Sequence, residues 1–449
     1  MRIDTLTIKN FKLFSEKEFN FHPEFNLIIG VNGTGKTSLL NAVSVALGGW
    51  ANAYIKSDQN LRPIEDHEMR EIQIDNRFDR SKDVLIKAEG QATIIDRYKN
   101  KKKCEADWSR KRSEVSTETL TYGDIKYSGS PTWYNLRLDT LGKDILEYIE
   151  SGKNFNLPVI AFYGCDRLWL PENELNIEAS AKAQYSRFDP YVDCFHTGAD
   201  HQAIGEWLLK HELASLQQKK DTPILQSIRK AAMYALEDCT GLRFDFEASR
   251  VMVNFKDDKV IPFDHLSDGQ RTILGLFCDI ARRAAILNPH LEDASEEVEG
   301  VVLIDELDLH LHPKWQRKII EDLRRLFPKI QFICTTHSPF LIQSLRSDDE
   351  LIMLDGEPLS EYANKGIEEI AKNMGVERPD TSVRYEKMKQ AAKSFLELLE
   401  EANSAPEEKQ EAYKKQLAEQ IAPYADNPAY QAFLELQYAS VFGERFETR

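Results

Sequence analysis

The sequence lacks long hydrophobic runs. Its apolar stretches, such as Val301 to Ile304, fall far short of the ~20 residues that a membrane-spanning helix needs. The first residues, Met1 to Phe11, alternate polar and apolar side chains and do not follow the basic, apolar and small-residue order of a secretory signal. We therefore expect no transmembrane helix and a cytoplasmic protein that does not bind membranes.

Paired cysteines and an excess of basic charge are also missing. The six cysteines form no CxxC pair, so we expect reduced, mostly buried thiols and neither disulfides nor zinc sites. The 58 basic and 74 acidic side chains leave a net charge of −16, which repels nucleic acid and anionic membranes. Any contact with DNA would therefore need a local basic patch.

The length and composition are those of a globular protein. The chain has 449 residues, of which 42% are apolar and 29% charged, and this length corresponds to roughly three units of ~150 residues. The domains that we expect are an N-terminal lobe with a β-subdomain over 1–170, a helical insertion over 171–249, a C-terminal lobe over 250–360 and a helical C-terminal region over 361–449.

The hydrophobic pattern predicts an α/β fold. The segments VVLIDE, HPKWQRKIIEDLRRLF and IQFICTTHS read as strand, helix and strand, after a helix predicted over Arg271 to Leu287. Apolar strands that alternate with helices indicate a parallel sheet covered on both faces. Another helix is predicted after Thr37, with a stop signal at Gly48 and Gly49. Strand patterns around the basic residues from Arg97 to Arg112 suggest a hairpin with a basic tip.

A phosphate-loop motif, GxxxxGK[ST], occupies Gly30 to Thr37 between a predicted strand and a predicted helix, which is the context that the motif requires. Its glycines let backbone N–H groups close around a triphosphate at a helix N-terminus. Lys36 would reach the β- and γ-phosphates, and the Thr37 hydroxyl would be a ligand of Mg²⁺.

Two adjacent acids, Asp305 and Glu306, follow the apolar run Val301 to Ile304. Adjacent carboxylates at the end of a buried strand are costly unless a cation neutralises them. We therefore expect Asp305 to hold Mg²⁺ through water and Glu306 to accept the proton of an attacking water.

Two further segments complete the pattern. In Leu266 to Gln270, Ser267 stands at the N-cap position of a predicted helix, and Gly269 would allow the close approach of an anion. This LSDGQ segment is a weak signal alone and becomes specific in the order found here. His337 follows an apolar strand and would donate a hydrogen bond to a γ-phosphate.

Together these motifs resemble the ABC-type ATPase heads of the SMC, RecF and OLD-like group. The opening TLTIKNFKLF and the run from IDELDLHLHPKWQ to FICTTHSP are similar to its compact bacterial branch, which includes anti-phage defence ATPases such as PtuA of Septu systems and AriA of PARIS systems. A strand of that branch is similar to LPVIAFYG with Asp166 and Arg167. The resemblance covers nearly the whole chain and is strongest over 1–48 and 250–345.

The resemblance implies a P-loop NTPase fold, namely an ABC-ATPase head with a mixed sheet, an N-terminal antiparallel β-subdomain, a helical subdomain and a C-terminal helical region. It also implies ATP and Mg²⁺ as cofactors and a homo-oligomer that is at least a head-to-head dimer. Ser267, Gly269 and Gln270 would contact the γ-phosphate bound by the other subunit, Asp308 would signal across the interface, and His337 would act as the switch. The residues that would bind phosphates are Asn32, Gly33, Thr34, Gly35, Lys36, Thr37 and Ser38.

Two features depart from that group. The Q-loop glutamine cannot be identified, because Gln59 is nearby but Asp66 to Arg70, where the loop is expected, contains no glutamine. Coiled-coil arms are not predicted, because the residues between Thr37 and Ser267 carry no heptads.

Weaker signals have ordinary explanations. His310 and His312 are interpreted as structural, because residues two apart in sequence point away from each other. Cys194 and His196 lack the two further ligands that zinc needs. The basic run, with Tyr98 and Trp108 interleaved, fits phosphate-backbone contact and a solvated hairpin tip equally well.

The function that we expect is an ATPase that regulates a partner effector in anti-phage defence, the effector being a nuclease of the HNH (PtuB-like) or TOPRIM type and the trigger nucleic acid or phage. A DNA-repair ATPase of the RecF or SMC type and a transporter subunit are the alternatives. The chain's extra length and helical C-terminal region count against transport. A nuclease in this chain is disfavoured, because no DxD pair follows Leu351, and a GTPase because no NKxD motif is present.

Overall fold

The computed structural model describes residues 1–55, 60–74, 77–96, 98–116, 118–127, 133–135, 138–165, 186–197, 201–355, 365–376, 383–404 and 428–442, together with 379, 406, 412–413 and 415–417. The chain divides into two compact units, Met1–Met374 and Gly375–Arg449. Within the described residues, every helix is too short or too polar to cross a membrane.

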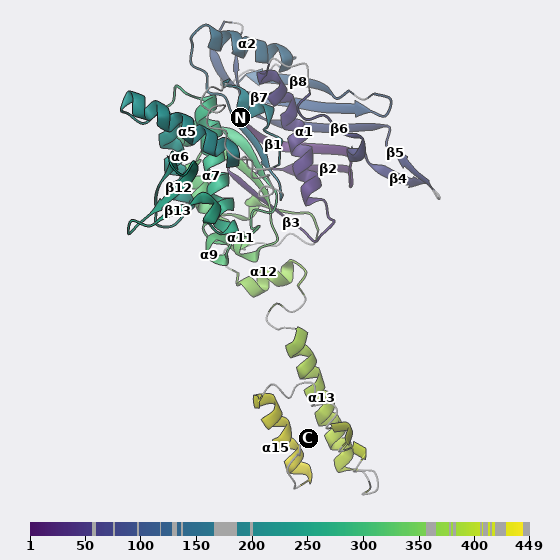
Figure 1. Cartoon of the computed structure of the whole chain (residues 1–449). Coiled ribbons are helices and arrows are strands. Elements are labelled where there is room, and N and C mark those ends of the chain that lie inside the picture. Colours follow the sequence, from purple (N-terminus) through teal and green to yellow (C-terminus); the bar gives the residue numbers. More distant parts are fainter. Residues whose placement is uncertain are drawn as a thin grey trace. The chain divides into compact units, whose positions relative to one another are not determined.

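The core of the first unit is a parallel sheet (Figure 1). Its strand order is β10 (Val159–Tyr163), β14 (Gly300–Ile304), β15 (Ile330–Thr335), β3 (Phe25–Ile29) and β16 (Leu351–Met353). The first four of these strands are buried at every position, as their largely apolar sequences predict. Because all five are parallel, their carboxyl ends meet at one edge, which brings the candidate site residues together.

A second, antiparallel sheet has the order β2 (Phe14–Asn20), β1 (Arg2–Phe11), β6 (Asp83–Ile95), β7 (Lys101–Ser113), β8 (Leu120–Tyr127) and β9 (Trp133–Asn135). Helix α1 (Lys36–Tyr54) contacts strands of both sheets. The Trp108 indole donates to the Ala46 carbonyl at 2.9 Å and meets Trp50 edge to face. The expected combination of parallel and antiparallel sheets is confirmed.

The glycine pair in α1 does not end the helix, so that prediction was wrong. Gly48 and Gly49 are buried in its interior, and α1 continues to Tyr54. A Cβ atom at Gly48 would lie 2.8 Å from the Cβ atom of Arg62. These glycines therefore permit a close approach of the chain around Arg62, which weighs more than the ~1 kcal/mol that glycine costs in a helix.

The basic run begins at the tip of a hairpin, as predicted, because the turn between the antiparallel strands β6 and β7 contains Lys99, and it continues along β7. Its described part forms most of strand β7, which pairs with β6, and Arg97 lies outside the described residues. Arg110 is fully buried and donates to the Asn60 side chain and the Arg62 carbonyl, both at 2.8 Å. Arg112 donates to the Ile64 carbonyl and to Asp66. Alternation along a strand turns these arginines inward, and they hold the segment that follows α1.

Burial lowers the pKa of the Arg110 guanidinium to about 9. Contact between the exposed lysines of this strand and DNA stays a prediction.

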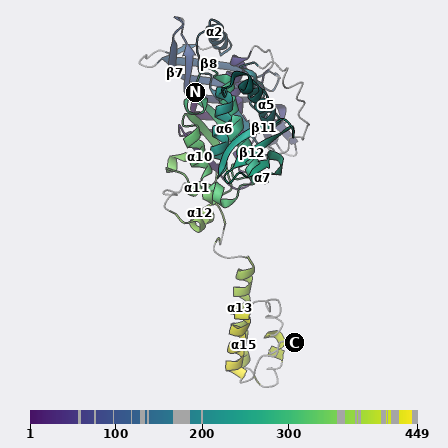
Figure 2. The same ribbon diagram turned by 60° about the vertical axis from the view of Figure 1, so that its left-hand side comes forward.

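The helical part of the first unit packs beside a three-stranded sheet (Figure 2). Helices α5 (His201–Gln218) and α6 (Pro223–Ala235) contact strand β11 (Cys239–Asp245), which pairs with β12 (Arg250–Phe255); β13 (Val260–Pro262) completes the sheet. Helix α6 ends at Ala235, four residues before β11 begins at Cys239. The segment predicted as one helix after His312 forms two, α9 (Pro313–Gln316) and α10 (Ile319–Leu326).

A buried ionic cluster fixes helix α7 (Asp268–Leu287). Asp279 accepts from Arg282 and Arg283, and the Tyr163 hydroxyl at the end of β10 donates to it at 2.8 Å. Burial alone would raise the pKa of Asp279, but the guanidiniums of Arg283 and Arg282 lower it below its ordinary value. Arg283 also bonds Asp193, next to α4 (Asp189–Val192). The cluster ties the helix that begins at the LSDGQ segment to the core sheet.

The remaining described elements of the first unit are short or peripheral. They are the strands β4 (Glu71–Ile74) and β5 (Arg77–Arg80) and the helices α2 (Leu138–Glu150), α8 (Ala294–Glu297), α11 (Pro339–Gln343) and α12 (Ile367–Asn373). Five of the six cysteines are buried and all six are free thiols, as expected.

The second unit is helical where it is described. It contains α13 (Val383–Asn403) and α15 (Pro428–Phe442). Its small core consists of Phe395, Leu399, Leu417, Leu434 and Tyr438.

Candidate functional site

The phosphate loop connects β3 to α1. Gly33 and Gly35 have φ angles of 88° and 102°, a left-handed conformation that glycine adopts without strain. Lys36 is 8% exposed, and its Nζ donates to the carbonyls of Gly30 at 2.7 Å and Val31 at 3.2 Å. Burial lowers the pKa of the Lys36 ammonium, while the carboxylates of Asp305 and Asp355 oppose that shift.

Asp305 lies directly beneath this loop, at the carboxyl end of β14. The Thr37 hydroxyl donates to its Oδ2 at 2.9 Å, and the Thr335 hydroxyl donates to its Oδ1 at 2.5 Å. A carboxylate and a hydroxyl in contact are hard oxygen donors of the kind that Mg²⁺ prefers. Among the described residues, no group of three or more His, Cys, Asp or Glu side chains forms a separate metal site.

Glu306 follows in a left-handed conformation, with φ of 50°. Its backbone N–H donates to the Thr335 hydroxyl at 2.7 Å, so Thr335 joins both acidic residues to strand β15. A non-glycine residue in this conformation carries backbone strain, which concentrates at functional sites.

Asp308 and the loop that carries His337 are in contact. The Asp308 Oδ1 accepts from the Thr336 hydroxyl and from the backbone N–H of His337, the latter at 3.3 Å. The fold therefore brings the two predicted loops together within one chain.

The LSDGQ segment begins helix α7 as predicted. Ser267 is the N-cap, its Oγ accepts from the backbone of Gln270 at 3.4 Å, and the Gln270 side chain accepts from the backbone N–H of Ser267 at 3.1 Å. In the described part of the chain, neither side chain bonds the phosphate loop. Ser267 and Gln270 therefore bond each other, and the Ser267 side chain is exposed.

Gly269 has a packing role that the sequence did not indicate. A Cβ atom at this position would lie 2.5 Å from the His310 carbonyl oxygen and 3.0 Å from the Trp315 ring. Backbone and ring atoms of the same chain therefore lie where a side chain at this position would be. A cavity of about 730 Å³ opens beside this contact, and Ser267, His310 and His312 are among its lining residues.

Two residues of the site were not predicted. Asp355, shortly after β16, accepts from the Val31 backbone N–H at 3.1 Å, and Gln316 lies between two of the predicted loops. The signal for Asp355 is an apolar run that ends in an acid, Leu351 to Asp355, which repeats the pattern before Asp305. A single glutamine in a polar segment gives no comparable signal.

The described residues identify no Q-loop glutamine. Asp66 to Glu68 form a short helix, and Glu68 is buried against Arg62 at 2.6 Å and Lys12 at 3.5 Å. Gln59, Asp166 and Arg167 lie outside the described residues.

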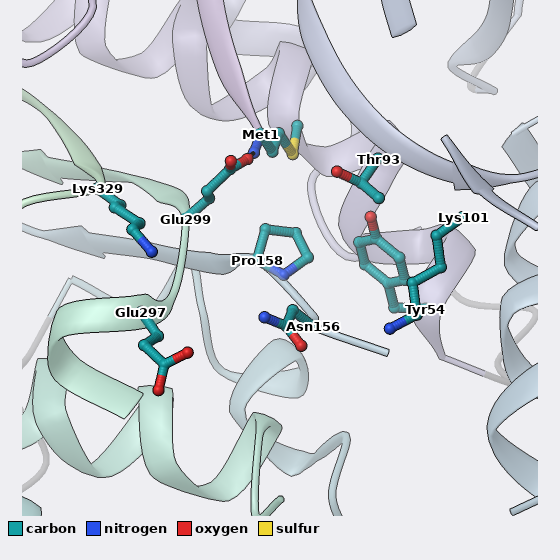
Figure 3. A pocket seen from close by; sticks show the side chains of 9 residues that line it. All are labelled: Met1, Tyr54, Thr93, Lys101, Asn156, Pro158, Glu297, Glu299 and Lys329. Atoms are coloured by element: carbon teal, nitrogen blue, oxygen red, sulfur yellow. Dashed lines mark hydrogen bonds and ion pairs between the residues drawn. The ribbon is translucent and has the colours of Figure 1, made fainter. Parts of the chain in front are cut away.

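A second cavity, of about 300 Å³, lies at the opposite end of the core strands (Figure 3). Pro158, Glu299 and Lys329, which line it, directly precede β10, β14 and β15. Glu299 pairs with the amino group of Met1. None of the predicted site residues lines this cavity, so it belongs to a different edge of the sheet.

Comparison with known proteins identifies the family of this chain. A model of the family AAA_21, described as "AAA domain, putative AbiEii toxin, Type IV TA system", matches residues 25–343. The "Retron Vc95 probable ATPase" of Vibrio cholerae serotype O1 biovar El Tor is 27% identical over 78% of this chain and 72% of its own length. The "Septu protein PtuA" of Bacillus thuringiensis is 25% identical over 88% of this chain and 91% of its own length.

Among solved structures, an SMC head bound to the C-terminal winged-helix domain of ScpA covers 78% of this chain and 94% of that chain, with 13% sequence identity and a TM-score of 0.45.

Proposed function

We propose that this chain, which belongs to the AAA_21 family and is related to retron probable ATPases and Septu PtuA proteins, binds ATP with Mg²⁺ and hydrolyses it. The observation that carries this proposal is the contact between the Thr37 hydroxyl and Asp305 at 2.9 Å, next to the buried Lys36. Residues 268 positions apart meet here in the arrangement that a Mg²⁺-bound phosphate chain requires.

Each residue has a role in this proposal. Lys36 would release the carbonyls of Gly30 and Val31 and donate to phosphate oxygens instead, and the backbone N–H groups of Asn32 to Ser38 would surround the phosphates. Thr37 and Asp305 would hold Mg²⁺, which neutralises phosphate charge. Glu306 would accept a proton from the attacking water.

We infer that the complete site needs two chains. Ser267, Gly269 and Gln270 would contact the γ-phosphate held by the other copy, Asp308 would respond to that copy, and His337 would donate to the γ-phosphate. The exposed position of Ser267, which bonds Gln270 at its own helix start, supports this arrangement. A two-fold symmetric dimer, in which both copies contribute the same surface, is the commonest oligomer.

We also propose that ATP turnover regulates a separate effector in anti-phage defence, with nucleic acid or another phage product as trigger. The relatives named for retrons and Septu systems support this class over DNA repair or transport. A nuclease of the HNH (PtuB-like) or TOPRIM type would be the effector. The helical region 361–449 is the candidate surface for it, because many of its described side chains are exposed.

The decisive test of nucleotide binding is Lys36→Ala. Its ammonium is the charged side chain of the loop, so we expect the variant to lose ATP binding below detection in a fluorescent-nucleotide titration. Lys111→Ala removes an exposed lysine of β7 and should bind like the wild type. Near wild-type affinity in Lys36→Ala would refute the phosphate-loop assignment.

The effector proposal predicts that the purified chain, with Mg²⁺ and ATP, leaves plasmid and phage DNA intact. It also predicts co-purification with the product of an adjacent gene, lost when the chain ends near Gly366. Metal-dependent cleavage by this chain alone, abolished by changing its own carboxylates, would overturn the proposal.

A further inference from the structure

Helix α9 connects three of the loops that the proposed function uses. It has only four residues, Pro313–Gln316. It directly follows the segment 305–312, which contains the acids Asp305, Glu306 and Asp308. Trp315 packs against Gly269 of the LSDGQ segment. On the other side, the Arg317 guanidinium lies over the Phe340 ring at 5.0 Å, next to the loop that carries His337.

Gln316 makes the polar part of this connection with both ends of its amide. Its Nε2 donates to the Leu311 carbonyl at 2.9 Å, and the Asp308 carbonyl lies at 3.5 Å. Its Oε1 accepts from the Ser338 hydroxyl at 2.8 Å. Ser338 is 5% exposed, so these bonds are largely shielded from competing water.

The same two loops are joined a second time by Asp308, which accepts from Thr336 and His337. Two independent links between residues 308–311 and 336–338 define one arrangement of both loops. An amide can serve here because it is both donor and acceptor, whereas a carboxylate can only accept.

We propose that Gln316 is a positioning residue that holds the Asp308 loop and the His337 loop in register, so that ATP hydrolysis depends on it while ATP binding does not. This proposal rests on the proposed function. Gln316 bonds the Leu311 carbonyl, whereas Lys36 bonds the Gly30 carbonyl and Thr37 bonds Asp305, so we expect nucleotide affinity to be set by residues other than Gln316.

The test uses three variants in the full-length chain. Gln316→Ala removes the bonds to the Leu311 carbonyl and to Ser338 but leaves the Asp308 link, and Gln316→Glu keeps an acceptor for Ser338 but places a carboxylate against the Leu311 carbonyl. Gln226→Glu, on the exposed side of α6, is the matched control. We expect both Gln316 variants to bind a fluorescent ATP analogue within twofold of the wild type and to lose about 10- to 100-fold in kcat, the size of effect that a small misplacement of reacting groups produces.

Ser338→Ala identifies the bond. This variant also removes the cap that the Ser338 hydroxyl gives to the Phe340 backbone N–H, so the bond is identified by coupling: the losses in kcat of Ser338→Ala and Gln316→Ala should add up to more than the loss in the double variant, because one bond cannot be lost twice. Unchanged kcat in Gln316→Ala would overturn the proposal. A loss of both ATP affinity and kcat, accompanied by a fall in Tm, would also overturn the proposal, because Gln316 would then be a general structural residue.

Hydrogen exchange without nucleotide separates this inference from the proposed function. Gln316→Ala should accelerate amide exchange in 306–312 and 336–339 and leave the phosphate loop unchanged. If the wild type fails to bind ATP, the proposed function falls, but faster exchange confined to these loops still supports the link. Unchanged exchange in both loops would refute it.

Discussion

The phosphate-loop half of the candidate site and its LSDGQ half are built in opposite ways. Lys36 and Asp305 are 8% and 5% exposed, and the partners of their side chains include the segment Gly30 to Thr37 and the remote Thr335 of β15. Ser267 and Gln270 are at the surface and bond each other across one helical turn. The first half is therefore assembled by the whole fold, and the second is a local helix start.

This difference has a functional meaning. Buried charges are stable only with partners, so the phosphate-loop half is held in place before any nucleotide arrives. The LSDGQ half has no such requirement, and its exposed N-cap is accessible to a ligand that another chain holds. Three experiments separate the two halves, from the largest expected effect to the smallest.

Mixing two inactive variants tests whether the halves act in different chains. Lys36→Ala disrupts the phosphate-loop half and Ser267→Arg disrupts the LSDGQ half, so each variant alone should hydrolyse no ATP. Mixed dimers contain one composite site without either lesion and should regain turnover, measured as phosphate release. Continued inactivity in dimers shown to be mixed would refute the two-chain site.

Glu306→Gln tests the chemistry of the buried half. The amide cannot take a proton from water, so we expect ATP binding to persist while turnover falls by ~10² to 10⁴. Glu247→Gln, in an exposed turn after β11, is the control. Unchanged phosphate release would assign the base to another residue.

Asp355 offers a finer test of the same half. Asp355→Ala removes the acceptor for the Val31 N–H and should weaken ATP binding about fivefold, the equivalent of one ordinary hydrogen bond of ~1 kcal/mol. Asp355→Asn keeps an acceptor and removes a negative charge near the phosphates, so it should bind ATP at least as tightly as the wild type. Equal weakening in both variants would contradict the anchoring role.

The sequence predicted the parts of the site that depend on local order. The phosphate loop, the acids after Val301 to Ile304 and the N-cap Ser267 each combine a short motif with the end of a strand or the start of a helix. Parallel strands place their carboxyl ends together, so the meeting of Thr37 with Asp305 follows from the pattern. Their roles with nucleotide stay predictions.

Long-range packing decided what the sequence could not show. From the sequence alone, Gly48 indicates the end of a helix, but in the structure Arg62 lies against it. From the sequence alone, Arg110 indicates a surface charge, but in the structure β7 faces α1 and Arg110 bonds Asn60. Strand β16 has three residues, too few for a clear pattern. Gln316 depends on two loops that are remote in sequence.

Helix α1 runs from one edge of the core sheet to the other. Its 19 residues span about 28 Å at the usual helical rise, from Lys36 beside the phosphate loop to Tyr54, which stacks on Tyr191 and lines the cavity at the far edge of the core sheet. Because the helix contacts strands of both sheets, the spacing between the phosphate loop and this cavity is set by the length of a single continuous helix.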